Sequence, residues 1–474
     1  MPNRIMRAAL LLASISLALI PTASAQEKAA PRIMDRTTSS TAAKAALTSA
    51  IDEITNVAGA RRVDPQLQAV VAADPAFGLG RGWYAAYAST LNAEQRNAEF
   101  VRAIKDAATG TAAEVTFITA LREWRAGRAN VARSLLDVVL QLTPDDPDVH
   151  MVRLFVAADA TERLRLAESS VKRFPDYAPF YNLLAYAQNG AGQNQAALQS
   201  VAKYASLKPT HPNAHDSYAE ILQMNGQYDA AETHYTAALS NDPAWEEALV
   251  GRAEIAVMRG KYAAARPHLQ QALALATTPT RKQALQRQIA ATYLYEGKLK
   301  DAKAVITQTI ADGEAASINV LPDKRTLAFV ALQEGNTAQA SSLYAASTPA
   351  NLPVTYPLND VIFHARLKHP DEVAKAAAAM EANAARVPEN ADAQEAARAA
   401  RVIDAVVKND MPAARAAHQR VMTPAYCALT GAFMTQAARR AGDKALAQTA
   451  MLDVEAYKAI NANAAFARMI ARSK

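Results

Sequence analysis

Residues 213–245, NAHDSYAEILQMNGQYDAAETHYTAALSNDPAW, read as two helices joined by a turn. Apolar residues recur at helical spacing up to Met224, and Asn225-Gly226 then interrupts the pattern. Glycine accepts the left-handed conformation that often ends a helix. A second helical pattern begins at Tyr228 and stops before Pro243, because proline cannot continue a helix. This stretch therefore predicts an antiparallel helix pair.

The same pattern recurs on both sides of this stretch. The turn glycine returns every 34 residues, at Gly192, Gly226 and Gly260, and an alanine keeps the same step at Ala197, Ala231 and Ala265. A helix pair alone cannot bury its apolar face, so a fixed period of this length predicts a solenoid of stacked pairs.

These positions resemble the tetratricopeptide repeat. The best copy carries the family's pattern at Gly226, Tyr228, Ala231, Tyr235, Ala238 and Pro243. Further copies are marked by Gly127, Gly297 and Gly335, and residues 145–178 form a shortened unit. The resemblance covers residues 111–348. It implies an all-α fold, a right-handed α-solenoid of antiparallel helix pairs with divergent N- and C-terminal helical regions.

The composition divides the chain into segments. We expect a signal peptide over 1–25, a flexible leader over 26–45 and an N-terminal helical region over 46–110. The repeats follow over 111–348, and a joint over 349–360 is rich in proline. Divergent helical repeats and a C-terminal cap complete the chain over 361–474, since terminal units of a solenoid are atypical.

The first 25 residues have the pattern of a secretory signal. Arg4 and Arg7 precede an apolar run over 8–20, and small residues follow at Ala23-Ser24-Ala25. This order predicts cleavage after Ala25 and a periplasmic product; release into the medium and a retained N-terminal anchor are the alternatives. The apolar run is too short to cross a bilayer comfortably, and no later segment is apolar enough, so we expect no membrane span.

The charge distribution argues against a nucleic-acid-binding protein, and the single cysteine argues against a disulfide-stabilised one. Removal of residues 1–25 lowers the formal charge from +6 to +4, and the charges are interspersed, so we expect no binding of nucleic acid. Cys427 is the single cysteine, which leaves no intramolecular disulfide. We interpret it as a small core residue, with a dimerising or redox thiol as the alternative.

No motif in the sequence indicates catalysis or a metal site. The glycines of Phe77–Trp83 could cradle a phosphate only between a strand and a helix; no strand pattern precedes them, and we expect a turn before a helix. His211 and His215 have the spacing of two ligands on one helix face, but Pro212 places His211 in the preceding turn. We therefore expect no catalytic residue, metal or cofactor, and no enzyme.

In the tetratricopeptide family the first helix of each pair lines a concave groove. Projection of that geometry onto this sequence predicts a partner-binding groove lined by Asn182, Tyr186, Asn189, Asp216, Glu220, Gln223, Glu247, Glu254 and Arg287, with Val250 and Tyr295 beside them. This lining is rich in carboxylates and poor in lysine. It favours a neutral or basic protein or peptide segment over a carboxylate-terminated peptide.

The sequence therefore predicts a periplasmic scaffold or adaptor that presents a curved helical surface to a protein partner. Envelope assembly and export are the settings that the resemblance favours. The alternative is a glycan-handling protein of the cell wall or of exopolysaccharide secretion, for which exposed clusters of aromatic residues would be needed.

Overall fold

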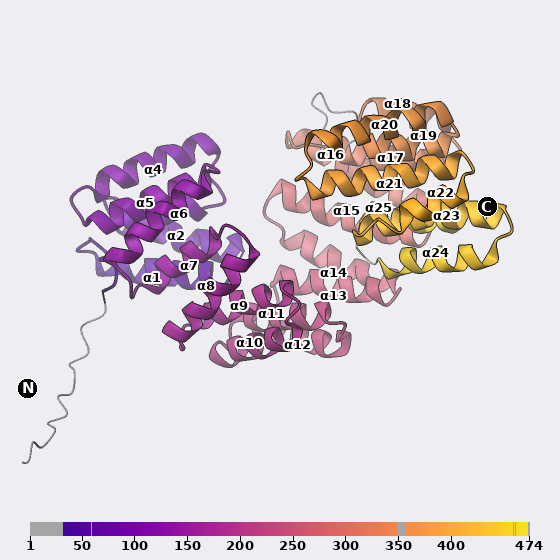
Figure 1. Ribbon diagram of the computed structural model, residues 1–474. Helices are drawn as coiled ribbons and strands as arrows, with labels where there is room; N and C mark the ends of the chain where they lie inside the picture. Colours follow the sequence, from indigo (N-terminus) through magenta and orange to yellow (C-terminus); the bar gives the residue numbers. More distant parts are fainter. Residues whose placement is uncertain (1–31, 58, 348–356, 458, 460, 473–474) are drawn as a thin grey trace, which may run out of the picture.

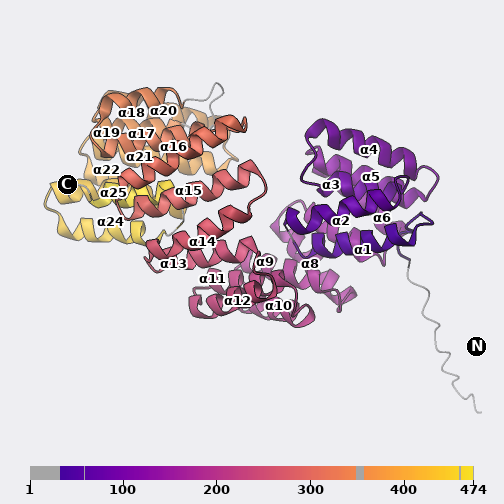
Figure 2. The same ribbon diagram turned by 180° about the vertical axis from the view of Figure 1, so that it is seen from behind.

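The computed structural model describes residues 32–57, 59–347, 357–457, 459 and 461–472. Over this part of the chain every regular element is a helix, and there are 25 of them. They form two lobes, α1–α7 and α15–α25, joined by the central helices α8–α14 (Figures 1 and 2). The predicted signal peptide (1–25) and most of the predicted joint (348–356) lie outside the described residues.

The N-terminal lobe consists of α1 (Thr41–Thr55), α2 (Ala60–Ala73), α3 (Gly78–Tyr87), α4 (Ala93–Ala107), α5 (Ala112–Arg125), α6 (Ala129–Leu142) and α7 (Pro147–Phe155). The central helices are α8 (Ala160–Arg173), α9 (Ala178–Gly190), α10 (Asn194–Leu207), α11 (Pro212–Met224), α12 (Tyr228–Asn241), α13 (Glu246–Met258) and α14 (Tyr262–Leu275).

The C-terminal lobe begins with α15 (Pro279–Tyr295), α16 (Leu299–Ala315), α17 (Leu321–Gln333), α18 (Thr337–Ala345), α19 (Pro357–Leu367) and α20 (Pro370–Arg386). It continues with α21 (Ala391–Val407), α22 (Met411–His418), α23 (Pro424–Arg440), α24 (Lys444–Ala456) and α25 (Ala462–Arg472). Consecutive helices pack in pairs from α1–α2 to α23–α24, and α25 is the one helix left over after this pairing.

The repeat pattern has the structural role predicted for it. The turn glycines have positive φ angles of 71–79°, at Gly127, Gly192, Gly226, Gly260, Gly297, Gly335 and Gly442. The alanines that follow them are fully buried at Ala132, Ala197, Ala231, Ala265, Ala302 and Ala340. The left-handed turn reverses the chain, so the two helices pack antiparallel. A methyl side chain where they cross lets them approach closely. The chain is thus an all-α solenoid with tetratricopeptide-type helix pairs.

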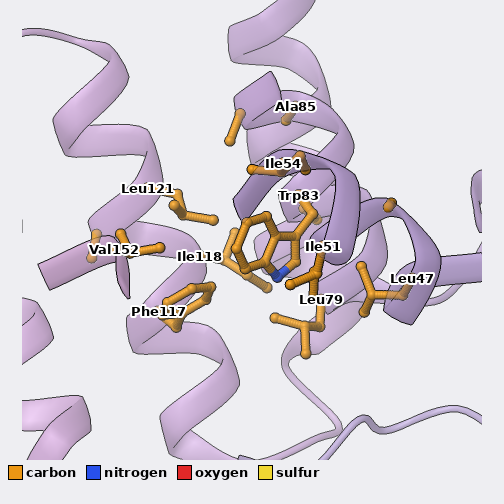
Figure 3. Packing of buried hydrophobic residues seen from close by; sticks show 14 of the residues in the cluster. Leu47, Ile51, Ile54, Leu79, Trp83, Ala85, Phe117, Ile118, Leu121 and Val152 are labelled. Atoms are coloured by element: carbon orange, nitrogen blue, oxygen red, sulfur yellow. The ribbon is translucent and has the colours of Figure 1, made fainter. Parts of the chain in front are cut away.

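The glycines of residues 77–83 lie inside helix α3, not in a turn before it. A Cβ on Gly78 would come within 2.8 Å of the Ala103 carbonyl oxygen, and one on Gly82 within 2.8 Å of the Ile118 side chain. These glycines therefore allow α3 to pack closely on α4 and α5. Trp83 follows them and is buried at the centre of the lobe (Figure 3).

Residues 32–40, expected within a flexible leader, run extended across the N-terminal lobe and are held by hydrogen bonds. The backbone N–H groups of Arg32 and Met34 donate to Asp145 and Asp146, each at 2.9 Å. The Thr37 backbone N–H donates to Glu114 at 2.8 Å. The difference arises because the carboxylates that accept these bonds lie on elements about 75 to 110 residues away, a distance over which local composition carries no information.

Helix α25 lies in the region where we expected the C-terminal cap. It packs against α15 as well as against α23, so it returns to helices far earlier in the chain. The Tyr295 hydroxyl donates to the Ala459 carbonyl at 2.7 Å, and the Arg468 guanidinium lies 5.3 Å from the centre of the Tyr295 ring. Over the described ranges, no helix has both the length and the apolar composition that crossing a membrane requires.

Candidate binding face

Three first helices, α9, α11 and α13, stand side by side in the central part of the solenoid (Figure 1). Because the repeat length is 34 residues, equivalent positions stack along this face. Tyr186, Glu220 and Glu254 occupy one such row, and the three are half-buried. The sequence projection therefore placed these residues on a common face of the structure.

Hydrogen bonds join side chains of this face from one helix to the next. The Tyr186 hydroxyl on α9 donates to Glu220 on α11 at 2.5 Å. The Gln223 amide on α11 donates to Glu254 on α13 at 2.9 Å. The Tyr235 hydroxyl on α12 donates to the Gln223 carbonyl oxygen at 3.0 Å. We call Tyr186, Asp216, Glu220, Gln223 and Glu254 the acidic ladder.

Asn189 lies at the end of α9, next to the ladder. The Asn225 amide donates to the Asn189 carbonyl oxygen at 3.0 Å, and the Asn189 amide donates to the Met224 sulfur at 3.2 Å. The Met224 side chain is 53% exposed, so this corner of the face offers both polar and apolar groups to solvent.

Asp216 is the buried member of the ladder. It is 7% exposed, and its Oδ1 atom has no hydrogen-bond partner among the described residues. Burial raises its pKa well above the ordinary value, and the charges of Glu247 and Glu220 add to the rise. Asn182, the equivalent residue one repeat earlier, is 1% exposed. Both were projected to line the groove, but their burial leaves them unable to contact a partner directly.

The carboxyl groups of the ladder, on Asp216, Glu220 and Glu254, form no ion pair with a lysine or arginine in the part of the chain that the structure describes. Burial raises the pKa of Glu254, and Glu220 adds to the rise, although the Gln223 hydrogen bond opposes it. Arg281 on α15, whose charge opposes this rise, is paired with Glu246.

The remaining projected residues lie at the edges of this face. Glu247 is exposed at the start of α13, and Val250 is buried. Arg287 on α15 forms a bidentate pair with Asp323, at 2.6 and 2.7 Å. Tyr295 is buried against the segment before α25. The open part of the face therefore ends at α13, because the chain's own C-terminal segment covers α15.

Residues of α1 and α2 also lie beside this face, and the projection from the repeat pattern did not include them. The Tyr204 hydroxyl donates to Asn56 at 2.8 Å, and Lys208 forms an ion pair with Asp52 at 2.7 Å. Arg61 and Arg62 both reach Asp242. The end of α1 and the start of α2 are thus bound to the end of α10 and to the turn before α13, about 150 to 180 residues later in the chain. No local signal in the sequence indicated these contacts.

The two candidate histidines do not form a metal site. The His211 ring accepts a hydrogen bond from the Asn213 backbone N–H at 3.2 Å and so caps α11. The His215 ring is instead stacked on His234. The described residues contain no cluster of three metal-binding side chains. Cys427 is half-buried, and its thiol donates to the Val421 carbonyl at 3.3 Å, which fits the interpretation as a packing residue.

We expect Asp216→Asn to stabilise the protein at neutral pH. The raised pKa means that the folded state holds a proton that the unfolded state has lost, so wild-type stability falls as pH rises above the ordinary carboxyl pKa of 3.8. Asparagine cannot ionise, and we expect a gain on the order of 1–3 kcal/mol at pH 7. The measurement is urea unfolding at pH 4 and pH 7.

The matched control is Asp176→Asn, which removes an exposed carboxylate and should change stability by less than about 0.5 kcal/mol. If Asp216→Asn gave the same gain at pH 4 as at pH 7, the ionisation of Asp216 would not be the cause.

Comparisons with known proteins add little beyond the fold. No family model matches this chain, and no curated protein sequence matches it. A thermophilic TPR protein of Thermus thermophilus is 20% identical over 39% of this chain and 100% of its own, with a TM-score of 0.34. PilF of Pseudomonas aeruginosa is 18% identical over 46% of this chain and 95% of its own, with a TM-score of 0.34.

YrrB, described as a TPR protein with an unusual peptide-binding site, is 16% identical over 37% of this chain and 91% of its own, with a TM-score of 0.28. The assignment of the fold depends on the helix pairs, the turn glycines and the buried alanines of this chain itself.

Proposed function

We propose that this protein is a binding scaffold that works without a covalent step, and that the acidic ladder receives a neutral or basic segment of a protein partner. The observation that carries the proposal is the row formed by the Tyr186 hydroxyl on α9 and the carboxyl groups of Glu220 on α11 and Glu254 on α13. Neither carboxyl group forms an ion pair with a described cation. A lysine or arginine of a partner would lie close to these carboxylates. Its positive charge would offset the repulsion between them.

The neutral members of the ladder support an extended or helical peptide as the ligand. Tyr186 and Gln223, with Asn189 beside them, carry hydroxyl and amide groups, which can exchange hydrogen bonds with a peptide backbone or with polar side chains. Rigid helices hold these groups in a fixed row, so little conformational entropy is lost when the partner binds.

The test is a pull-down with the full-length tagged protein from its own cells, comparing wild type with a Glu220→Gln/Glu254→Gln variant. Glutamine keeps the size of both side chains and removes their charge. We expect recovery of the partner to fall about tenfold or more, since hydrogen bonds to charged groups contribute about 1.5–3 kcal/mol. Asp216 is left unchanged in this variant, because it is buried and contacts no partner directly.

A Glu94→Gln/Glu389→Gln variant is the matched control, because it removes two exposed carboxylates away from the ladder. Its partner recovery should equal that of wild type. Equal recovery with both double variants would exclude the acidic ladder as the binding face.

We propose further that the protein works in the periplasm, exported by residues 1–25. The charged start, the apolar run and Ala23-Ser24-Ala25 support this location. The same pull-down tests it, since bait recovered from a periplasmic extract should have the mass of a chain that begins at Gln26. Bait found with the cytoplasm at full length would contradict export.

The glycan-handling alternative receives no support from the tryptophans. Trp83 and Trp245 are 1% and 2% exposed, and Trp124 is half-buried. Sugar rings stack on exposed aromatic faces, and none of these residues offers one.

A further inference from the structure

The C-terminal lobe contains a cavity of about 250 Å³, lined by residues of α17, α19, α23 and α25. Its wall is mainly apolar and includes Phe329, Leu332, Ile362, Leu429, Phe466 and Ile470. Binding pockets for small molecules are typically lined in this way, with a few polar groups that orient the ligand. Here those groups include Arg366 and Gln333.

Arg366 brings a positive charge to this apolar wall. Its guanidinium is partly buried and donates to the neutral Gln333 carbonyl oxygen at 2.7 Å. Burial lowers its pKa, and the positive charge of Arg440 lowers it further. None of the ion pairs found among the described residues includes Arg366, and residues 348–356, just before α19, contain no aspartate or glutamate.

A buried cation without an anion is costly, because its desolvation is not repaid by a partner charge. Arginine is also the side chain best suited to hold a carboxylate, which it can bind through two parallel hydrogen bonds. The cavity therefore combines space for an apolar chain with an unneutralised site for one compact negative charge.

We propose that this cavity binds a small amphiphilic carboxylic acid, with its carboxylate on Arg366 and its apolar chain among the side chains of α17, α23 and α25. Two sources share this chemistry: a free fatty acid of medium length, and the C-terminus of a peptide that ends in apolar residues. No residue of this cavity belongs to the acidic ladder, so the two sites succeed or fail independently.

The test is calorimetric titration of the full-length protein with decanoate and, in parallel arms, with decanol and with acetyl-Leu-Leu as its free acid and as its amide. We expect saturable binding of an acid, with affinity at least about tenfold above that of the matching neutral compound. Decanoate binding would assign a fatty acid, and binding of the dipeptide acid alone would assign a peptide terminus. Saturable binding of neither acid would overturn the proposal.

Three variants locate the site. Arg366→Gln should weaken binding of the acid about tenfold or more and leave decanol unchanged. Arg366→Lys keeps the charge and should retain part of the affinity, since lysine cannot form the two parallel bonds. Ala425→Leu fills part of the cavity from a half-buried position and should weaken the acid and decanol alike.

Thermal unfolding separates a binding defect from misfolding. A ligand that binds only the folded state raises the melting temperature. At the same ligand concentration we expect decanoate or the dipeptide acid to raise the melting temperature of wild type more than that of Arg366→Gln, while the unliganded melting temperatures of the two proteins stay close. Equal acid affinity in wild type, Arg366→Gln and Ala425→Leu would show that the acid binds elsewhere and would refute the proposal.

Discussion

Trp83→Ala is expected to destabilise the N-terminal lobe by about 3–5 kcal/mol, the usual cost of removing a buried large aromatic side chain. Trp83 is 1% exposed, and its ring lies 5.4 Å from that of Tyr87 and 5.7 Å from that of Phe117. Leu79, Ile118 and Leu121 surround it in the same cluster (Figure 3). The three close-packed glycines of α3 leave little freedom for the backbone to collapse into the space.

The loss should remain local, because the helix pairs of a solenoid contact mainly their neighbours. Hydrogen exchange is the suitable measurement: we expect protection to fall across α1–α7 and to stay unchanged across α15–α25. Val101→Ala is the control within the same lobe; Val101 is 55% exposed, and its loss should cost less than about 0.5 kcal/mol. A uniform loss of protection over the whole chain would contradict a divisible solenoid.

Gly251→Ala is expected to destabilise the protein by about 1–3 kcal/mol, the usual cost of overpacking. In an exposed helix the same change would stabilise by about 0.5–1 kcal/mol. Here the new Cβ would lie 2.1 Å from the Tyr235 ring, and the Tyr235 hydroxyl is bonded to Gln223. The ring must move, which also disturbs the acidic ladder.

Gly190→Ala is the matched control. Apart from the neighbouring residues of its own helix, no heavy atom lies within 4 Å of the new Cβ. It should stabilise by about 0.5–1 kcal/mol because alanine loses less backbone entropy than glycine. Thermal unfolding of both variants checks the pair. The same sign of effect at both positions would contradict the packing described for Gly251.

Two turns of the C-terminal lobe lack the glycine that marks the repeats elsewhere in the sequence. The central turns were found through glycines, all of which have positive φ angles. The turn after α21 uses Asn409 with φ 60°, and the turn after α19 uses Lys368 with φ 60°. Asparagine visits this conformation more readily than most residues, and lysine rarely does. Without glycine the sequence pattern that marks a turn is weak. Helix pairs joined by such turns therefore do not match the repeat pattern.

The sequence predicted which residues of the candidate site occupy equivalent positions in successive repeats. It did not predict which of them are exposed to solvent. The step of 34 residues placed Tyr186, Glu220 and Glu254 in one row, and the structure joins the first two by a hydrogen bond. The same step placed Asn182 and Asp216 in a row that the fold buries. How deeply a helix sinks between its neighbours depends on the side chains of the adjacent pairs, which a single repeat does not contain.

The sequence by itself determined the helix pairs, their turns and the register of the repeats, because these depend on residues only a few positions apart. Tertiary structure alone decided that the end of α1 and the start of α2 meet the end of α10 and the turn before α13, that α25 returns to α15, and that Arg366 faces an apolar cavity. Each of these contacts depends on the curvature of the whole solenoid, which accumulates from small rotations between many successive pairs.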